Sequence, residues 1–551
     1  MLNFSASLEQ FTEQLSLEAL GINLQKRTVA IFTAFNEMSI ANSGLEKVAD
    51  GVKKGVLSCD FNAVTFNLPN LSDAVTTGAR ANKYAMPMRD NIADVVEAYA
   101  AMNSIDGFVF IANDAITVAG MLMGAMRVNL PSLFIGGGCM KTSLIGDKKM
   151  GFNAAYETSG LLKSGKITLS DLEKMQKDLI KDCGNACDSY EANSSLIIAE
   201  ALGLTLPGAS TCPADAKERE QLAFETGITV TKMIKNVMTP RSIATQEAVK
   251  TAVCVDLAMG SSSTSIINLI AVARETGNEI TYADIAEWKS RVPRIVEIST
   301  RGQLFIEDFD AAGGVYAVIK QLIEHGNSDG IYKIFDGEPM RDHAESVDFA
   351  PGNAIKDIHT RKASPLRIVY GNLAKDGAIA FMNQTQTFSG TARVFDSQEE
   401  ALDAISARLI KAGDAVVIRN EGPAGAPGMR DVYLPVSTLV GLDLDKDVAV
   451  ITDGRVPNIS RGPVVGCVSP ECGREDGLMD IIQNGDQIEI NLLKERINLK
   501  LTAKEIAQRK RAVVPRVGDD GAMLRKYAAS VSPAYLGCVT DARRKNDDGV
   551  F

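Results

Sequence analysis

The sequence predicts an α/β N-terminal domain followed by a mostly β C-terminal domain. The first observation is an alternation of strand-like and helix-like segments over residues 27–138. The second is a change near residue 360 to closely spaced β-branched runs. The third is length, because 551 residues are too many for a single hydrophobic core. We therefore expect two domains, covering residues 1–360 and 361–551.

The N-terminal segments follow the order expected of a parallel sheet with helices on both faces. Strands are expected at 27–35, 63–69, 107–114 and 132–138, and helices at 45–56, 89–102 and 119–128. The strand segments are apolar runs, which is typical of strands buried on both faces. Ligand-binding groups in such sheets collect at the C-terminal strand ends. Polar residues stand at these ends here, among them Glu37, Asp73, Asn113 and Asp114.

A mostly helical part is expected from about residue 150 to residue 345. The Ser-rich turn 259–265 precedes one of these helices, and Ser262 lies within it. A turn of this kind is able to hold a carboxylate or phosphate at a helix N-terminus, and an ordinary N-cap explains it equally well.

The C-terminal part is dominated by short β runs separated by short helices. Strands are expected at 367–374, 377–382, 391–396, 414–419, 447–454, 462–468 and 486–493. The stretch 416–429, VVIRNEGPAGAPGM, ends a strand with Glu421 and then places three glycines and two prolines in seven residues. A lone acid before a rigid turn is a common position for a ligand or metal group, and a tight turn with a solvated glutamate is the alternative.

Composition argues against several classes of function. The net charge is −11 and no Lys/Arg-rich run occurs, which argues against nucleic acid or an anionic membrane as the main partner. The first twenty residues have no basic region and do not resemble a signal peptide. The most apolar window, 107–126, is interrupted by Asn113 and Asp114 and is not expected to cross a membrane. We expect a cytoplasmic protein.

Cysteine and histidine usage argues against several kinds of site. The nine cysteines are odd in number and contain no CxxC pair, so neither a disulfide framework nor a zinc ribbon is indicated. Most are expected to be buried thiols, including Cys467 and Cys472. Three histidines, His325, His343 and His359, lie in polar stretches, which disfavours a histidine metal site or a catalytic triad.

Six segments in one consistent order carry a family resemblance. They are EALGLTLPGAS, GNLAKDGAI, TARVFDSQEEAL, EGPAGAPGM, ITDGR and GPVVGCVSPE. Together they resemble the dihydroxy-acid, phosphogluconate and sugar-acid dehydratase family over essentially the whole chain. The resemblance implies a C-terminal β-barrel domain, a homodimer and a site between the two domains. It also implies dehydration of 2,3-dihydroxy acids with a three-cysteine iron–sulfur cluster, a divalent metal and a serine base.

The chain departs from this family at the cluster positions. The first cysteine position is Ala41, and the second falls in the stretch 111–120, which contains no cysteine. The third is Ala186 in an ungapped match, with Cys187 one residue away and Cys183 three residues before. One remaining thiolate does not hold a cluster unless other ligands contribute. We therefore expect no iron–sulfur cluster.

The chain also departs from the family at the other catalytic positions. An ungapped match aligns the family Cys-Asp-Lys triplet with 114–116, whereas a small gap keeps Asp114 as the aspartate and makes the lysine Ala115. In either match the metal-binding lysine is missing. The serine base becomes Pro457, and the histidine of the Ser-rich helix becomes Asn268. The usual dehydratase mechanism is not supported, because proline has no proton-accepting side chain.

An oxygen-rich set of metal ligands survives in the resemblance. Asp73 and Glu421 match family metal ligands, and Asp114 is a third candidate. Carboxylates at strand ends suit Mg²⁺, with water and substrate oxygens completing the coordination. The alternative is that these acids are part of the scaffold and accept hydrogen bonds from the backbone.

Three functions remain open. The first is a cluster-free enzyme that binds a small hydroxy acid through Mg²⁺ and uses a new base; the candidates for the base are Glu37, Asp453, Ser460 and Cys187, and those for substrate binding are Asn113, Ser262 and Arg455. The second is a pseudoenzyme that binds a ligand or partners an active paralogue in a hetero-oligomer. The third is a working dehydratase with an unusual cluster on Cys183, Cys187 and Asp114.

Overall fold

The computed structural model describes residues 15–540 apart from several short gaps. The gaps are residues 16, 71–77, 146–147, 164, 180–181, 299–303, 361–363, 425–427, 475 and 512–520. Within the described part, no helix is long and apolar enough to cross a membrane.

The N-terminal domain is built on a parallel sheet of four strands in the order β2-β1-β3-β4. The strands are β1 (Thr28–Thr33), β2 (Asn62–Asn67), β3 (Gly107–Ile111) and β4 (Ser132–Ile135). All residues of β3 and β4 are buried, which explains why both segments are continuous apolar runs. The predicted parallel α/β domain is therefore confirmed, with each strand slightly shorter than its apolar run.

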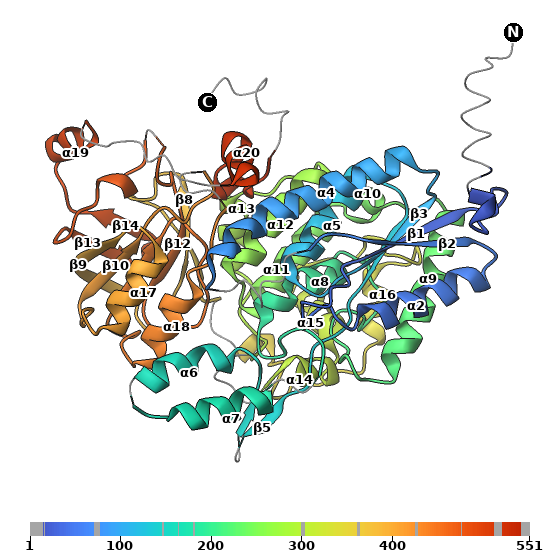
Figure 1. Ribbon diagram of the computed structural model, residues 1–551, viewed down its shortest axis with the longest axis horizontal. Coiled ribbons are helices and arrows are strands. Elements are labelled where there is room, and N and C mark those ends of the chain that lie inside the picture. Colours follow the sequence, from blue (N-terminus) through green and yellow to red (C-terminus); the bar gives the residue numbers. More distant parts are fainter. Residues whose placement is uncertain are drawn as a thin grey trace, which may run out of the picture.

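Helices cover both faces of this sheet, as Figure 1 shows. Helices α2 (Leu45–Ser58) and α9 (Glu218–Lys235) pack together against one face, and α4 (Ala85–Met102) packs on α5 (Ala115–Val128) at the other. Further helices continue the α5 side; they are α8 (Tyr190–Ala201), α10 (Pro240–Ile243), α11 (Gln246–Met259), α12 (Ser263–Thr276), α13 (Tyr282–Lys289), α14 (Ile306–Ala311), α15 (Gly314–Glu324) and α16 (Met340–Ser346).

A small subdomain connects the two domains along one side. It consists of the hairpin β5 (Ser143–Ile145) and β6 (Lys148–Met150) and of helices α6 (Ala154–Lys163) and α7 (Leu169–Leu179). Helix α6 packs against α18 (Tyr433–Gly441) of the C-terminal domain, so it lies beneath both domains in Figure 1.

The C-terminal domain is a sheet of eight strands in the order β14-β13-β9-β10-β11-β12-β8-β7. The strands are β7 (Leu366–Val369), β8 (Gly377–Phe381), β9 (Thr387–Phe395), β10 (Asp414–Ile418), β11 (Ala449–Thr452), β12 (Val464–Ser469), β13 (Gln487–Asn491) and β14 (Arg496–Leu499). A bridge between Tyr370 and Arg496 joins the two edge strands, so the sheet is nearly closed. The predicted mostly β, barrel-like domain is confirmed.

Alternation along the barrel strands separates two hydrophobic cores. On β10, Ala415 and Val417 pack into a core made only by the C-terminal domain. Val416 and Ile418 point the other way and belong to the core that continues into the N-terminal domain. Helices α17 (Gln398–Ser406) and α18 cover this outer face, and α19 (Ala503–Lys510) and α20 (Ala522–Ser530) follow the last strand. One sheet therefore packs on both of its faces.

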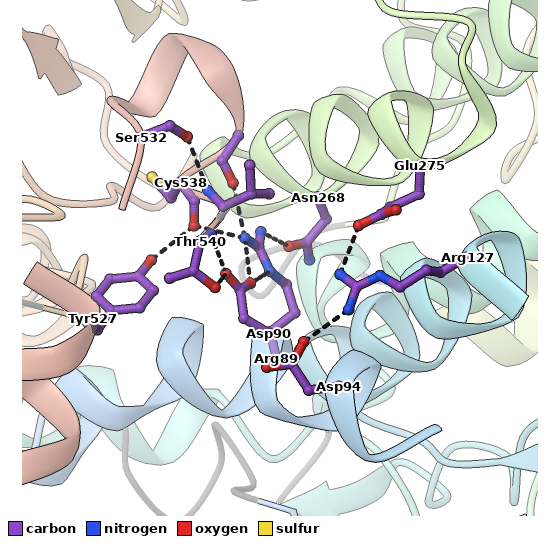
Figure 2. Close-up of polar contacts among 12 residues, drawn as sticks. Arg89, Asp90, Asp94, Arg127, Asn268, Glu275, Tyr527, Ser532, Cys538 and Thr540 are labelled. Carbon is purple, nitrogen blue, oxygen red and sulfur yellow. Dashed lines mark hydrogen bonds and ion pairs between the residues drawn. The ribbon is translucent and has the colours of Figure 1, made fainter. Parts of the chain in front are cut away.

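The end of the described chain returns to the N-terminal domain and is fastened to α4. Arg89 is fully buried and donates to the carbonyls of Gly537 and Cys538 at 2.9 and 2.8 Å. Asp90 pairs with Arg89 and accepts from the backbone N–H of Thr540 at 2.7 Å. Figure 2 shows these contacts converging between α4 and the C-terminal segment. A buried charge with this many partners fixes the path of the segment.

Candidate functional site

The end of β3 places Asn113 and Asp114 beside the segment that contains Ala41. Asp114 is the N-cap of α5, and its Oδ1 accepts from the backbone N–H of Thr117 at 2.9 Å. Its Oδ2 accepts from Nδ2 of Asn42 at 3.2 Å, and the side chain is 3% exposed. Both carboxylate oxygens therefore already accept hydrogen bonds.

A group of buried asparagines connects the positions where the resemblance expects cluster cysteines. Asn113 Nδ2 donates to the carbonyl of Ala41. Asn185 Nδ2 donates to the carbonyl of Asn113 at 2.9 Å, and Asn193 Nδ2 donates to the carbonyl of Ala186 at 2.8 Å. Asn42 Oδ1 accepts from the backbone N–H of Asn113 at 3.3 Å. We call Asn42, Asn113, Asn185 and Asn193 the asparagine network.

These residues do not fit an iron–sulfur cluster. Ala41 and Ala186 have no ligand atoms, and the amide of Asn113 lies between their segments. Burial raises the pKa of Cys187 well above its ordinary value and that of nearby Cys139 to about 12, so both stay neutral thiols. Cys183 is exposed. Three thiolates are therefore not brought together.

The two domains meet along a seam between the Ser-rich turn and the segment after β11. Arg455, 1% exposed, donates to Thr264 Oγ1 at 2.8 Å, to Asn82 Oδ1 at 3.1 Å and to the carbonyl of Met429 at 2.9 Å. Ser263 Oγ donates to the carbonyl of Val456 at 2.8 Å. The predicted substrate-binding residue Arg455 thus ties three segments together across the seam.

A pocket of about 80 Å³ opens at this seam. Its walls come from both domains and include Tyr190, Ser262, Arg294, Tyr433, Pro457 and Asn458. Ser262 caps α12 by accepting from the backbone N–H of Ser265 at 2.9 Å, and it also lines the pocket. The N-cap alternative is therefore confirmed, and it places the positive end of a helix next to the pocket.

Asn268, the residue at the family histidine position, lies deeper in the fold. Its Oδ1 accepts from Arg89 Nη1 at 3.2 Å, and its Nδ2 lies 3.4 Å from the carbonyl of Ala115. Figure 2 shows it pointing at the guanidinium group of Arg89. This side chain connects the C-terminal fastening to the first residue of α5.

Behind the pocket wall, Tyr190 donates its hydroxyl to Asp256 Oδ1 at 2.6 Å. Asp256 is on α11, is fully buried, and its Oδ2 has no hydrogen-bond partner among the described residues. Burial raises the pKa of Asp256 to about 6, and burial beside Asp256 raises that of Tyr190 well above its usual range. This buried pair of Tyr190 and Asp256 was not predicted from the sequence.

Glu421 lies at the end of β10, inside the C-terminal domain. Its Oε1 accepts from the backbone N–H of Gln398 at 2.8 Å and is 3.4 Å from Arg430 Nη1. Its Oε2 is buried and has no hydrogen-bond partner in the described part of the chain. Burial raises the pKa of Glu421 to about 7. A Cβ at Gly454 would lie 2.8 Å from Glu421 Cβ, so the acid lies directly beside the seam segment.

The three predicted metal ligands are not assembled into one site by the described residues. Asp73 lies outside the described residues. Asp114 and Glu421 are held by different partners, as given above. Across the described ranges, no group of three or more His, Cys, Asp or Glu side chains is placed to hold a metal ion. The buried free oxygen of Glu421 is the observation that fits a cation best.

The predicted replacement bases lie away from the pocket wall. Glu37 is exposed in the turn after β1. Ser460 Oγ lies 3.3 Å from the carbonyl of Asp445 and accepts from the backbone N–H of Gly462 at 3.2 Å, which is a turn-stabilising arrangement. Asp453 accepts from two backbone N–H groups, those of Glu421 and Cys472. The raised pKa of Cys187 disfavours the thiolate that a base would need.

Asp431 was not predicted as part of the site. Asp431 is 7% exposed, pairs with Arg455 in a backbone bridge and donates its N–H to Asn82 Oδ1 at 3.0 Å. It lies two residues beyond the Gly/Pro stretch singled out in the sequence, so a longer window would have included it. Cys467 and Cys472 are buried, as predicted.

Comparison with known proteins gives one consistent result. The family model for the dihydroxy-acid/6-phosphogluconate dehydratase N-terminal domain matches residues 26–342, and the C-terminal model matches residues 355–538. A dihydroxy-acid dehydratase of Pyrococcus abyssi is 34% identical over 97% of this chain and 98% of its own length. One from Caldanaerobacter subterraneus is 36% identical over 90% of each chain, and one from Moorella thermoacetica is 34% identical over 95% and 97%.

Proposed function

The chain belongs to the dihydroxy-acid/6-phosphogluconate dehydratase family, and from this premise we propose that it binds and acts on a small hydroxy carboxylic acid without an iron–sulfur cluster. The reaction class is elimination or proton abstraction next to the carboxylate, and a divalent metal such as Mg²⁺ assists it. The observation that carries the proposal is the pocket at the domain seam, where the Ser262 turn and the Pro457 segment face one another.

The chemistry of the pocket suits a hydroxy acid. The N-terminus of α12 and the guanidinium of Arg294 favour a carboxylate on one side. Tyr190 also lines the pocket, and its hydroxyl donates to Asp256 behind the wall. A volume of about 80 Å³ limits the ligand to a small one. The size of the pocket and the positive charge on this side therefore suit a small carboxylate, and the carboxyl groups of Asp188 and Glu191 also line the pocket.

Glu421 is the residue we expect to hold the metal. The free buried oxygen of Glu421 supports this role. A Mg²⁺ ion held there would supply positive charge to the ligand's carboxylate. Asp431 is a further carboxylate on the same seam and is included in the test below.

Titration calorimetry with Mg²⁺, followed by D-glycerate as a simple 2,3-dihydroxy acid, tests the proposal. We expect Mg²⁺ binding that is lost in Glu421→Gln, and glycerate binding that requires Mg²⁺. Asp431→Asn is measured in parallel to locate the metal. Glu489→Gln, which changes an exposed glutamate on β13, is the matched control and keeps both affinities. A protein that binds neither Mg²⁺ nor any small carboxylate contradicts the proposal.

None of the bases predicted from the sequence lines the pocket, which favours a second candidate, a pseudoenzyme that binds the same ligand without turnover. Dehydration of glycerate would release pyruvate, which a coupled assay detects. Binding without product across a panel of hydroxy acids supports the pseudoenzyme. Turnover that is abolished by Glu421→Gln excludes it.

A further inference from the structure

We infer that the asparagine network replaces a cofactor as the cross-link between three segments of the N-terminal domain. The segments are 39–42, which follows β1, 111–115 at the end of β3, and 185–193 at the start of α8. In this protein side-chain amides join these segments, together with backbone hydrogen bonds such as that from the N–H of Gly184 to the carbonyl of Ile40. The inference does not depend on the proposed function, because it holds for an enzyme and for a pseudoenzyme alike.

The asparagine side chains form hydrogen bonds with buried backbone groups of the neighbouring segments. Asn113 spans the gap in two directions, because its Nδ2 donates to Ala41 and its Oδ1 accepts from the N–H of Gly137 at 2.6 Å. The carbonyl of Asn113 in turn accepts from Asn185. A buried carbonyl or N–H without a partner costs about 1–3 kcal/mol, so each of these bonds is expensive to lose.

The network asparagines also contact one another. Asn185 Nδ2 also donates to the carbonyl of Ala192 at 2.7 Å and lies 3.3 Å from Asn193 Oδ1. Asn193 Nδ2 reaches the carbonyls of Ala186 and Ser189, each at 2.8 Å. Amides suit this role because each one supplies two donors and an acceptor without a charge. The segment 185–193 is thereby folded onto itself and onto Asn113.

The space between these three segments is filled by protein atoms. The four network asparagines are between 0% and 4% exposed, and Ala41 and Ala186 are 2% and 6% exposed. A Cβ at Gly137 would lie 3.0 Å from Asn113 Nδ2, so the amide packs directly on the glycine loop after β4. A cluster would need this volume together with three thiolates, and neither is present.

The geometry also decides between the two ways of matching the second cysteine position. Asn113 is the residue that contacts both Ala41 and Asn185, the neighbour of Ala186. Asp114 points to Asn42 and to the first turn of α5 instead. Residue 113 therefore lies between the other two positions, and Asp114 is kept as the aspartate that follows.

Thermal unfolding tests the inference with the full-length protein. We expect Asn113→Ala to lower the melting temperature by about 5 °C, because it leaves two buried backbone groups without partners. Asn103→Ala is the matched control, since Asn103 is exposed and its Nδ2 donates to Tyr99. We expect this control to change the melting temperature by less than about 1 °C.

The same measurement is repeated on the wild type in air with a chelator and after anaerobic incubation with iron and sulfide. Identical melting temperatures support the inference. A rise on incubation with iron and sulfide, or equal effects of Asn113→Ala and Asn103→Ala, overturns it.

Hydrogen exchange of the wild type provides a test that needs no variant. Peptides covering 111–115 and 136–140 are followed by mass spectrometry in air with a chelator. Slow exchange at the N–H groups of Asn113 and Gly137 supports a closed network, because both donate to asparagine oxygens. Exchange as fast as in an exposed loop overturns the inference.

Discussion

The asparagine network and the wall of the pocket share one segment, 185–193, in which Tyr190 lies between Asn185 and Asn193, yet they satisfy buried polar groups in different ways. In the network, neutral amides bond to backbone carbonyls and to one another. In the wall, Tyr190 bonds to a carboxyl group, Asp256, that has a free oxygen among the described residues. The first arrangement consists of neutral amides, with one bond to a carboxyl group, that of Asp114, whereas the second keeps titratable groups next to a ligand-sized space.

The asparagine network therefore serves the structure, whereas the domain seam is open to a ligand. At the positions where the resemblance expects a cofactor, the amides of the network bond to neighbouring segments of the fold. The seam between the domains contains a pocket, a helix N-terminus and ionisable groups. We therefore expect changes in the network to alter stability at every pH, and changes in the wall to have pH-dependent effects.

The largest expected effect is that of Asn185→Ala. The substitution removes the donors to the carbonyls of Asn113 and Ala192, and we expect a loss of about 3–5 kcal/mol of unfolding free energy. Urea unfolding at pH 5 and at pH 8 is the measurement. The loss is expected to be the same at both pH values, and a difference would show that the network is coupled to a titrating group.

The second effect is the pH dependence contributed by Asp256. Its pKa is raised from 3.8 to about 6, so between pH 4 and pH 6 the folded state holds a proton that the unfolded state has released. Its contribution to stability is therefore fully present below pH 4 and is lost as the pH rises through 6, by about 3 kcal/mol. Asp256→Asn is expected to flatten this part of the pH–stability curve. An unchanged curve would contradict the assignment.

The smallest effect is expected for Tyr190→Phe, which removes only the hydroxyl that Asp256 accepts from. At pH 5 the partner is a neutral acid, and we expect a loss of about 1 kcal/mol. At pH 8 the partner is a carboxylate, and we expect a loss of about 2 kcal/mol because bonds to charged groups are stronger. Thermal melts at the two pH values measure the difference. Equal losses would mean that Asp256 does not titrate between them.

The sequence predicted the fold better than the site. Apolar runs in the sequence identified β1 to β4 and most barrel strands, because a strand that is buried on both faces has a continuous apolar run. The hairpin β5–β6 was missed, since its strands have only three residues each and β6 includes two lysines. Strand β14, RINL, was also missed; it has four residues, of which one is charged and one is an asparagine, so it has no continuous apolar run. Short elements are specified by their partners and not by their own pattern.

The site depended on contacts that no local pattern contains. Tyr190 and Asp256 are 66 residues apart, on two helices that pack together. The only signal was one acid in the otherwise apolar segment 252–259 of α11. An isolated asparagine is typical of a loop, so the joint role of Asn113 and Asn185 became visible only in three dimensions. Ser262 was correctly weighed as an N-cap because that signal is local.

The most direct test of the account is the iron and acid-labile sulfide content of the wild-type protein, produced with ample iron and purified without oxygen. Because the asparagine network fills the positions around Ala41 and Ala186, we expect a colourless protein with far less than one iron per chain. A brown protein with stoichiometric iron and sulfide would contradict the account, since a cluster would then occupy the volume assigned to the amides.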